Sequence, residues 1–216
     1  MKERILSIFG GKILNSERSE FFDAMFTGII TNTGEISKRG TNELSVKTDK
    51  EFTGKLSRGL SIAVDGICLT VISKSDTEFS VDFIPETEAK TNIKYLKVNS
   101  LVNLELPATY KSFLSGHIVQ GHIDGVGRLE SIKKNDNSHL LKFSIPKDLS
   151  KYIVEKGSIA VNGISLTIIE AKNKYFTVGI IPHTWRNTII HTIKVSDFVN
   201  VEVDILAKYV EKLIKQ

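Results

Sequence analysis

The chain contains short runs in which apolar and polar residues alternate, and one closing run with a different period. Residues 79–83 and 199–203 alternate strictly, which is the period of a strand with one buried face. Similar short runs rich in Val, Ile, Phe and Thr are separated by Gly, Asn, Asp and Lys along most of the chain, a texture typical of strands and turns. Residues 205–214 instead carry an apolar stripe at helical spacing. This stripe predicts a terminal amphipathic helix, and pattern alone favours its packing on its own chain.

The same pattern occurs twice along the chain. A shift of 97 residues places residues 66–70 (Gly-Ile-Cys-Leu-Thr) on residues 163–167 (Gly-Ile-Ser-Leu-Thr), and residues 84–87 on residues 181–184. Further upstream the offset is 93, so the second copy carries four extra residues, for which the hydrophilic stretch 133–138 is the natural place. A repeat of this length predicts two tandem domains.

The predicted domains are residues 25–112 and 113–204, followed by the helix at residues 205–216. Several short strands in each copy favour a small, closed or nearly closed antiparallel barrel, because closure removes exposed strand edges. Residues 1–24 lack the strand-and-turn texture and are interpreted as an N-terminal extension. Their basic residues are matched by acidic ones, which disfavours a targeting role.

Composition and charge set bounds without naming an activity. The 216 residues are 41% hydrophobic and 25% charged, as in an ordinary globular protein. The net charge of +4 is spread along the chain, which disfavours nucleic-acid binding because that needs clustered basic residues. No apolar run approaches the ~20 residues of a membrane span. The single cysteine, Cys68, cannot form an intrachain disulfide, which fits a cytoplasmic protein.

Standard catalytic signatures such as a nucleophile elbow, a phosphate-binding loop or a zinc-protease helix are missing from the sequence. The remaining candidates are small polar residues at equivalent places in the two copies, namely Cys68 with Thr70 and Ser165 with Thr167. Residues two apart in a strand share a face, so each pair could line a pocket. Pattern alone favours ordinary strand packing for all four.

A few other polar residues have plain structural explanations. Asp204 directly precedes the terminal helix and suits its N-cap. Lys156, beside a glycine, has the setting of a solvated surface lysine. His117 and His122 lie in a glycine-rich segment, residues 115–125, where the backbone can approach a ligand closely. No cysteine or third histidine lies nearby in the sequence, which disfavours a metal site.

Three motifs together resemble those of riboflavin synthase alpha chains: residues 25–30 (Met-Phe-Thr-Gly-Ile-Ile), residues 115–125, and residues 162–167 (Asn-Gly-Ile-Ser-Leu-Thr). The resemblance runs from Met25 nearly to the end of the chain, so residues 1–24 depart from the family pattern. It implies an all-β fold of two tandem, similar six-stranded Greek-key β-barrels followed by a C-terminal α-helix. It also implies a homotrimer assembled through these helices, in place of intrachain packing.

The resemblance further implies an activity. In this family two molecules of 6,7-dimethyl-8-ribityllumazine give riboflavin and 5-amino-6-(D-ribitylamino)uracil by transfer of a four-carbon unit, without metal or other cofactor. The active site lies between the N-terminal barrel of one subunit and the C-terminal barrel of its neighbour. The nearest alternative is a non-catalytic lumazine- or flavin-binding antenna protein, and a more distant one is an unrelated tandem-barrel binding module. Association with lumazine synthase is left open.

Site residues follow from the resemblance position by position. The implied catalytic residues are Ser165, Asp204, His122 and Cys68; Ser165 or a nearby water would add to C7 of one lumazine, with Asp204 and His122 assisting proton transfer. The implied substrate-binding residues are Phe26, Thr27, Gly28, Ile29, Ile30, Cys68, Leu69, Thr70, Asp82, Phe83, Ile84, Pro85, Glu86, Thr87, Gly121, His122, Ile123, Lys156, Ser165, Leu166, Thr167, Gly179, Ile180, Ile181, Pro182, His183 and Thr184.

Overall fold

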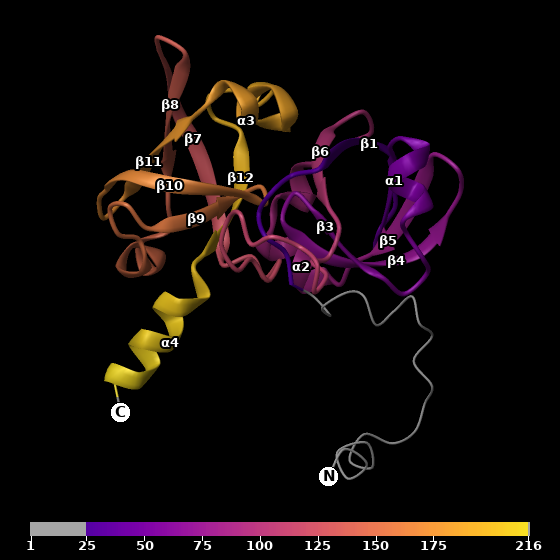
Figure 1. Ribbon diagram of the computed structural model, residues 1–216, viewed down its shortest axis with the longest axis horizontal. Coiled ribbons are helices and arrows are strands. Elements are labelled where there is room, and N and C mark those ends of the chain that lie inside the picture. The colour runs from indigo at the N-terminus through magenta and orange to yellow at the C-terminus, as the bar shows by residue number, and fades with distance from the viewer. Residues whose placement is uncertain (1–24, 216) are drawn as a thin grey trace.

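The computed structural model describes residues 25–215, which form two closed six-stranded antiparallel β-barrels and a C-terminal helix (Figure 1). The predicted all-β fold of two barrels followed by a helix is therefore confirmed. The interpretation of residues 1–24 as an extension concerns residues outside the described part of the chain.

The first barrel closes in the order β1-β2-β5-β4-β3-β6. The connection from β2 to β3 passes over two strands, as does the connection from β5 to β6, which gives the Greek-key connectivity. The strands are β1 Asn32–Arg39, β2 Glu43–Lys47, β3 Ser61–Val64, β4 Ile67–Lys74, β5 Glu78–Asp82 and β6 Leu101–Glu105. The helices are α1 Lys50–Gly54, α2 Pro85–Lys90 and the 3-10 helix η2 Asn92–Tyr95.

The second barrel has the same connectivity, closing in the order β7-β8-β11-β10-β9-β12. Its strands are β7 Gly125–Asn135, β8 Ser138–Ser144, β9 Ser158–Val161, β10 Ile164–Ala171, β11 Tyr175–Ile180 and β12 Phe198–Val203. Its helices are η3 Lys147–Tyr152, α3 Pro182–Asn187, η4 Ile189–His191 and, after the barrel, α4 Ile205–Ile214. The extra residues expected at 133–138 lengthen the β7–β8 hairpin, since β7 has 11 residues and β1 has eight.

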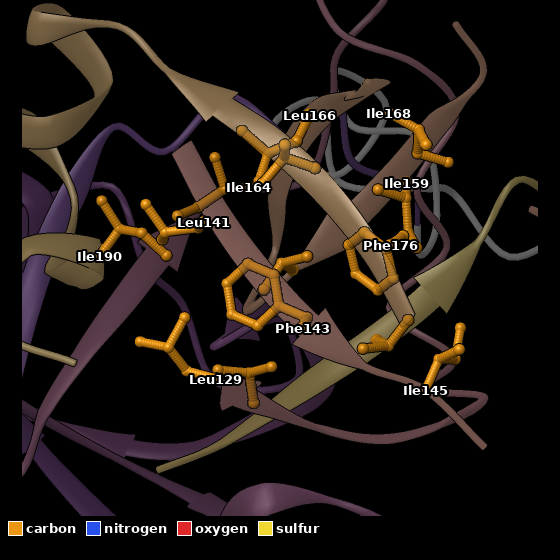
Figure 2. Packing of buried hydrophobic residues seen from close by; sticks show 14 of the residues in the cluster. Leu129, Leu141, Phe143, Ile145, Ile159, Ile164, Leu166, Ile168, Phe176 and Ile190 are labelled. Carbon is orange, nitrogen blue, oxygen red and sulfur yellow. The ribbon is translucent and has the colours of Figure 1, made fainter. Parts of the chain in front are cut away.

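Each barrel is filled by its own apolar core. In the second barrel Leu129, Leu141, Phe143 and Phe176 point inward from β7, β8 and β11 and are fully buried (Figure 2). The rings of Phe143 and Phe176 pack with centroids 5.6 Å apart. Each side chain of this size stabilises the fold by roughly 1.5–3 kcal/mol when it leaves water, so the inward positions account for the closure of each barrel.

The polar positions of β12 are also buried, contrary to the half-buried strand that the period predicted for residues 199–203. Asn200 and Glu202 of β12 are 0% and 3% exposed, and their equivalents in β6, Asn103 and Glu105, are 0% and 4% exposed. The reason is that these side chains lie at the boundary between the barrels. Asn103 donates to the carbonyl of Asn162 in the second barrel at 2.9 Å. The polar face therefore meets the other domain and not solvent.

Two tight turns meet at the centre of this boundary. Asp65-Gly66 joins β3 to β4 and Asn162-Gly163 joins β9 to β10, and all four residues have φ between 44° and 78°. Positive φ at both central residues is the requirement of a type I′ hairpin turn, which Asp-Gly and Asn-Gly satisfy. A Cβ on Gly66 would lie 2.5 Å from the amide nitrogen of Gly163. The two turns therefore touch backbone to backbone.

The two turns differ where Asp65 stands in the place of Asn162. Burial raises the pKa of Asp65 from 3.8 to about 7, although hydrogen bonds from Asn103 and Asn92 act to lower it. Between about pH 4 and pH 7 the folded chain therefore holds a proton at Asp65 that the unfolded chain has released. The stability that this proton confers is complete below about pH 4 and is lost as the pH rises to about 7.

The variant Asp65→Asn should accordingly gain stability relative to wild type as the pH rises from about 4 to 8. The gain has an upper bound of about 4 kcal/mol, from 1.36 kcal/mol per pKa unit. Urea unfolding at several pH values measures the difference. Asp76→Asn is the matched control because Asp76 is largely exposed and paired with Lys50 on the surface. A pH-independent difference for Asp65→Asn would contradict the assignment.

Helix α4 is capped at its N-terminus by Asp204, whose side chain accepts a hydrogen bond from the amide of Leu206 at 2.9 Å. The predicted N-cap is therefore confirmed. Lys208 forms an ion pair with Asp124 at 2.6 Å, and Glu211 pairs with Lys151 of η3. These contacts attach the polar side of the helix to the second barrel.

The apolar stripe of α4 is not covered by the described residues, so the intrachain packing that pattern alone favoured is not found. Figure 1 shows the helix extending away from the second barrel. No residue of α4 is buried. The exposed apolar side chains are Leu206, Tyr209, Val210, Leu213 and Ile214, each more than half exposed.

None of the helices in residues 25–215 has the length and apolar character of a membrane span.

Candidate active site

The segment that leads into each barrel lies on the other barrel. Gly28 precedes β1, yet its carbonyl accepts a hydrogen bond from the amide of Ser165 in β10 at 2.8 Å. Gly121 precedes β7, and its carbonyl accepts from the amide of Cys68 in β4 at 2.9 Å. Both repeats therefore contribute to the surroundings of Ser165 and of Cys68.

Glycine is required at both of these crossing points. Gly28 and Gly121 have φ of +75° and +77°, a region that favours residues without a side chain. A Cβ on Gly28 would lie 2.6 Å from Cβ of Ser165, and a Cβ on Gly121 would lie 2.6 Å from Cβ of Cys68. These two contacts explain the glycines in the Thr-Gly and Gly-His motifs.

Cys68 lies in a pocket of about 400 Å³ on the first barrel. Its lining consists of Asn42, Cys68, Leu69, Thr70, Asp82, Phe83, Ile84 and Thr87. Cys68 and Thr70 share the outer face of β4, whereas the side chain of Leu69 is buried in the barrel. All the lining residues except Asn42 are among the predicted substrate-binding residues. Asn42 was missed because it stands in the β1–β2 connection, outside every motif.

The thiol of Cys68 is partly buried. Burial raises its pKa above 9.0, and the charge of Glu202 acts in the same direction, against a hydrogen bond from Ser61. Because the thiolate is the nucleophilic form, a raised pKa makes Cys68 a weak nucleophile at neutral pH. Its chemistry fits contact with a ligand better than attack on one.

The 97-residue shift gives the corresponding surface of the second barrel. The residues at these positions are His139, Ser165, Leu166, Thr167, Gly179, Ile180, Ile181 and Thr184. His139 replaces Asn42 and stacks on Trp185 of α3, with ring centroids 3.7 Å apart and planes within 8°. Sequence reasoning missed His139 as it missed Asn42. The two surfaces are thus similar in backbone and different in side chains.

Ser165 is hydrogen-bonded to a histidine that was not among the predicted catalytic residues. Nδ1 of His117 lies 2.7 Å from Oγ of Ser165, and the imidazole is 8% exposed. Burial lowers the pKa of His117, and the charge of Asp204 offsets this only in part. The ring is therefore neutral at pH 7, and a neutral imidazole bound to a hydroxyl can accept its proton.

Within the chain, His122 lies apart from Ser165. It directly follows Gly121, which binds Cys68, and its side chain is exposed. His122 is thus next in the chain to the residue that binds Cys68, whereas His117 and Asp204 lie with Ser165. The two histidines share one glycine-rich segment, and the path of the backbone decides which of them reaches Ser165.

Two other predicted site residues differ in their exposure to solvent. Phe26 is fully buried between the barrels with Ala63, Val119 and Ala160, so its side chain supports the segment that carries Gly28. Lys156 is exposed in a turn with φ of 65°.

The rims of both sites carry exposed apolar side chains, since Ile84 and Ile181 are 61% and 58% exposed. Pro85 and Pro182, at the next positions, begin α2 and α3. Glu86 of α2 pairs with Lys90, whereas its counterpart His183 interacts with Asn187. Among residues 25–215 there is no group of three His, Cys, Asp or Glu side chains suited to a metal ion.

Known proteins share this double-barrel arrangement. The family model of the lumazine binding domain matches residues 27–107 and again residues 120–204. The riboflavin synthase of Actinobacillus pleuropneumoniae is 40% identical over 193 residues, covering 88% of this chain and 90% of the relative. That of Mycobacterium bovis is 39% identical over 199 residues, covering 88% and 98%. A crystal structure of LumP bound to riboflavin matches with a TM-score of 0.77 at 27% identity, covering 82% of this chain and 98% of LumP.

Two copies of the matched domain, each closed into a barrel, define the class of protein: the chain belongs to the lumazine-binding family. Within that family it is related over 88% of its length to proteins named riboflavin synthase. The resemblance seen in the motifs is thereby confirmed.

Proposed function

We propose that the chain converts two molecules of 6,7-dimethyl-8-ribityllumazine into riboflavin and 5-amino-6-(D-ribitylamino)uracil. The observation that carries the proposal is a pair of sites with like frameworks and unlike chemistry, one holding the His117–Ser165 pair and the other the Cys68 thiol. A four-carbon transfer between two identical heterocycles needs one donor and one acceptor. Similar sites with different polar groups meet that need, and the riboflavin synthase relatives support it.

The His117–Ser165 pair supplies the activation of a nucleophile. Neutral His117 takes the proton of Ser165 as Oγ, or a water that it orients, adds to C7 of one lumazine. The negative charge of Asp204 stabilises the imidazolium that results. The 7-methyl group of the lumazine at the Cys68 pocket passes a proton to exposed His122, which is next to Gly121 in the chain, and becomes the carbon nucleophile. Holding the two rings in register is the main contribution of the fold.

The two sites of one chain lie on different barrels. Two lumazines can react only when the sites that hold them face each other. We propose a homotrimer in which the first barrel of one chain faces the second barrel of its neighbour. The exposed apolar stripe of α4 supports this assembly, because a surface of that kind marks an interface.

Replacing Leu213 by glutamate should convert a trimer of three 24.1 kDa chains into folded monomers, because Leu213 is 71% exposed and belongs to no core cluster of residues 25–215. Riboflavin formation should fall with the trimer fraction. Sedimentation velocity measures the mass, and Lys212→Gln on the polar side of the same helix is the matched control. A trimer that survives Leu213→Glu would contradict assembly through α4.

A second candidate function is lumazine or flavin binding without turnover. The similarity to LumP, solved in complexes with 6,7-dimethyl-8-(1'-D-ribityl) lumazine and with riboflavin, supports binding by the same fold. The His117–Ser165 pair favours the enzyme, because binding alone does not require a base beside a hydroxyl.

One assay separates the two functions. The full chain is incubated with 6,7-dimethyl-8-ribityllumazine alone, and riboflavin absorbance is followed. Formation of riboflavin without any added cofactor is the expected result. Saturable binding with no riboflavin would instead identify a binding protein.

A further inference from the structure

Two buried carboxylates occupy equivalent places next to the candidate sites. Glu105 ends β6 and Glu202 lies in β12, 97 residues later, and they are 4% and 3% exposed. Neither is among the residues proposed above for chemistry. A carboxylate is costly to bury unless donors surround it, so the partners of these groups indicate their role.

Glu105 binds the turn that borders Ser165. Its carboxylate accepts hydrogen bonds from the amide and the hydroxyl of Thr27, both at 2.7 Å, and from the amide of Gly28 at 3.0 Å. The carbonyls of the same two residues accept from the amides of His117 and Ser165, at 3.2 and 2.8 Å. A residue of the first barrel thus holds the backbone that fixes the His117–Ser165 pair of the second.

Glu202 does the same in the opposite direction. Its carboxylate accepts from the amides of Gln120 and Gly121, at 2.7 and 2.9 Å. The carbonyl of Gly121 accepts from the amide of Cys68 in the first barrel. Hydrogen bonds to a carboxylate are stronger than those between neutral groups, and small displacements at a reacting site are costly to turnover.

We propose that Glu105 and Glu202 are positioning residues that act across the barrel boundary, Glu105 on the Ser165 site and Glu202 on the Cys68 site. The proposal rests on the proposed function for the identity of the ligand. The proposal has a distinctive consequence. Loss of either carboxylate impairs the site on the other barrel and leaves the site on its own barrel intact.

The two carboxylates differ in one partner. Gln120 stands where the first repeat has Thr27, so Glu202 lacks the hydroxyl donor that Glu105 has. The charged or titratable groups facing Glu202 are Asp124, Lys208 of α4 and Cys68 of β4. Burial raises the pKa of Glu202 to about 7; the charge of Asp124 acts in the same direction, against the hydrogen bonds from Gln120 and Gly121 and the charge of Lys208. Below about pH 7 the protonated group binds the turn less well, so the Cys68 site should weaken there.

Each site contains its own reporter. Cys68 is the only cysteine of the chain and Trp185 the only tryptophan. Trp185 stacks on His139 at the second barrel, so quenching of its fluorescence by 6,7-dimethyl-8-ribityllumazine reports on the Ser165 site. Protection of Cys68 from iodoacetamide by the same ligand reports on the Cys68 site.

The variants Glu105→Gln and Glu202→Gln keep the size of the side chain and replace one acceptor by a donor. We expect Glu105→Gln to raise the lumazine concentration for half-quenching of Trp185 by about tenfold, the scale of one lost charged hydrogen bond, with protection of Cys68 unchanged. Glu202→Gln should give the reverse. In wild type, the concentration for half-protection of Cys68 should rise as the pH falls from about 8 to 6, and Glu202→Gln should remove this dependence.

Amide hydrogen exchange tests, without any ligand, whether each carboxylate holds the site on the other barrel. Exchange at Ser165 should rise about tenfold in Glu105→Gln while Cys68 stays within about twofold of wild type, and Glu202→Gln should reverse the pattern. This measurement decides the proposal even when wild type binds no lumazine, an outcome that would defeat the proposed function alone.

A gain-of-function variant covers the case in which a glutamine variant does not fold. Gln120→Thr supplies the hydroxyl that Glu202 lacks, so it should strengthen lumazine protection of Cys68 and move its pH dependence to lower pH. Equal effects at both sites, effects on the carboxylate's own barrel, or no effect in any variant would overturn the proposal.

Discussion

Replacing Ser165 by alanine is expected to lower the rate of riboflavin formation by about 10²–10⁴-fold, the range that general acid–base catalysis contributes. His117→Gln should cause a loss of similar size, because glutamine can hydrogen-bond to Ser165 but cannot accept its proton. Lumazine binding should stay within a few-fold of wild type in both variants, since Ser165 and His117 form one edge of the site only. Single-turnover measurements together with binding titrations separate the two effects.

The double variant gives the sharper result. Two groups that act as a unit do not add, so Ser165→Ala combined with His117→Gln should be no slower than the slower single variant. The pKa of His117 lies below its ordinary value, so the neutral base persists to pH values below about 6.5. The acid limb of the pH profile of kcat should therefore lie below that value in wild type and vanish in His117→Gln.

His191→Gln is the matched control, because His191 hydrogen-bonds to the carbonyl of Thr188 and its ring contacts Trp185, not the His117–Ser165 pair. It should retain wild-type turnover. Additive losses in the double variant, or wild-type rates in either single variant, would remove the His117–Ser165 pair from the reaction.

The largest loss of stability is expected from Gly66→Ala. Gly66 has φ of +77°, and its added Cβ would lie 2.5 and 2.7 Å from backbone atoms of Gly163. A left-handed conformation costs a residue with a Cβ roughly 1–2 kcal/mol, and overpacking of a tight contact adds about 1–3 kcal/mol. The free energy of unfolding should therefore fall by about 3 kcal/mol, because backbone atoms of the facing turn cannot move aside as a flexible side chain would.

Gly54→Ala provides the control for this prediction. Gly54 ends α1, and a Cβ added there would meet no atom of another part of the fold within 4 Å. Alanine at this position should therefore be neutral or stabilise by up to about 1 kcal/mol. Urea unfolding measures both variants. Stability of Gly66→Ala within about 0.5 kcal/mol of wild type would show that the two turns do not press on each other as the structure indicates.

Much of the fold could be predicted from the sequence. The repeat at offsets of 97 and 93 residues indicated two domains, and strand-length runs between turn residues indicated barrels, because strand period and turn chemistry are local properties. The residues around Cys68 were predicted nearly completely by resemblance, with Asn42 as the exception. Its backbone position carries it to the pocket, and no residue pattern marks that position.

The candidate site was predicted less completely, because its geometry depends on how the two barrels pack against each other. His117 and His122 are five positions apart in one glycine-rich segment, and nothing local distinguishes the one that reaches Ser165. The alternating polar residues of β12 were expected to leave one face unburied, yet Asn200 and Glu202 are buried at the barrel boundary. A period of two shows which residues share a face, not what that face contacts.

The sequence by itself determined two barrels, their connecting turns and the capped helix α4, because each depends on residues near one another in the chain. Only the tertiary structure decided that residues 26–30 and 119–123 cross between barrels, that Glu105 and Glu202 hold these segments, and that residues 25–215 leave the stripe of α4 uncovered. The carboxylate bonds join residues about 80 positions apart within each repeat. The backbone bonds of Gly28 with Ser165 and of Gly121 with Cys68 form only once the two barrels have met, so no local pattern encodes them.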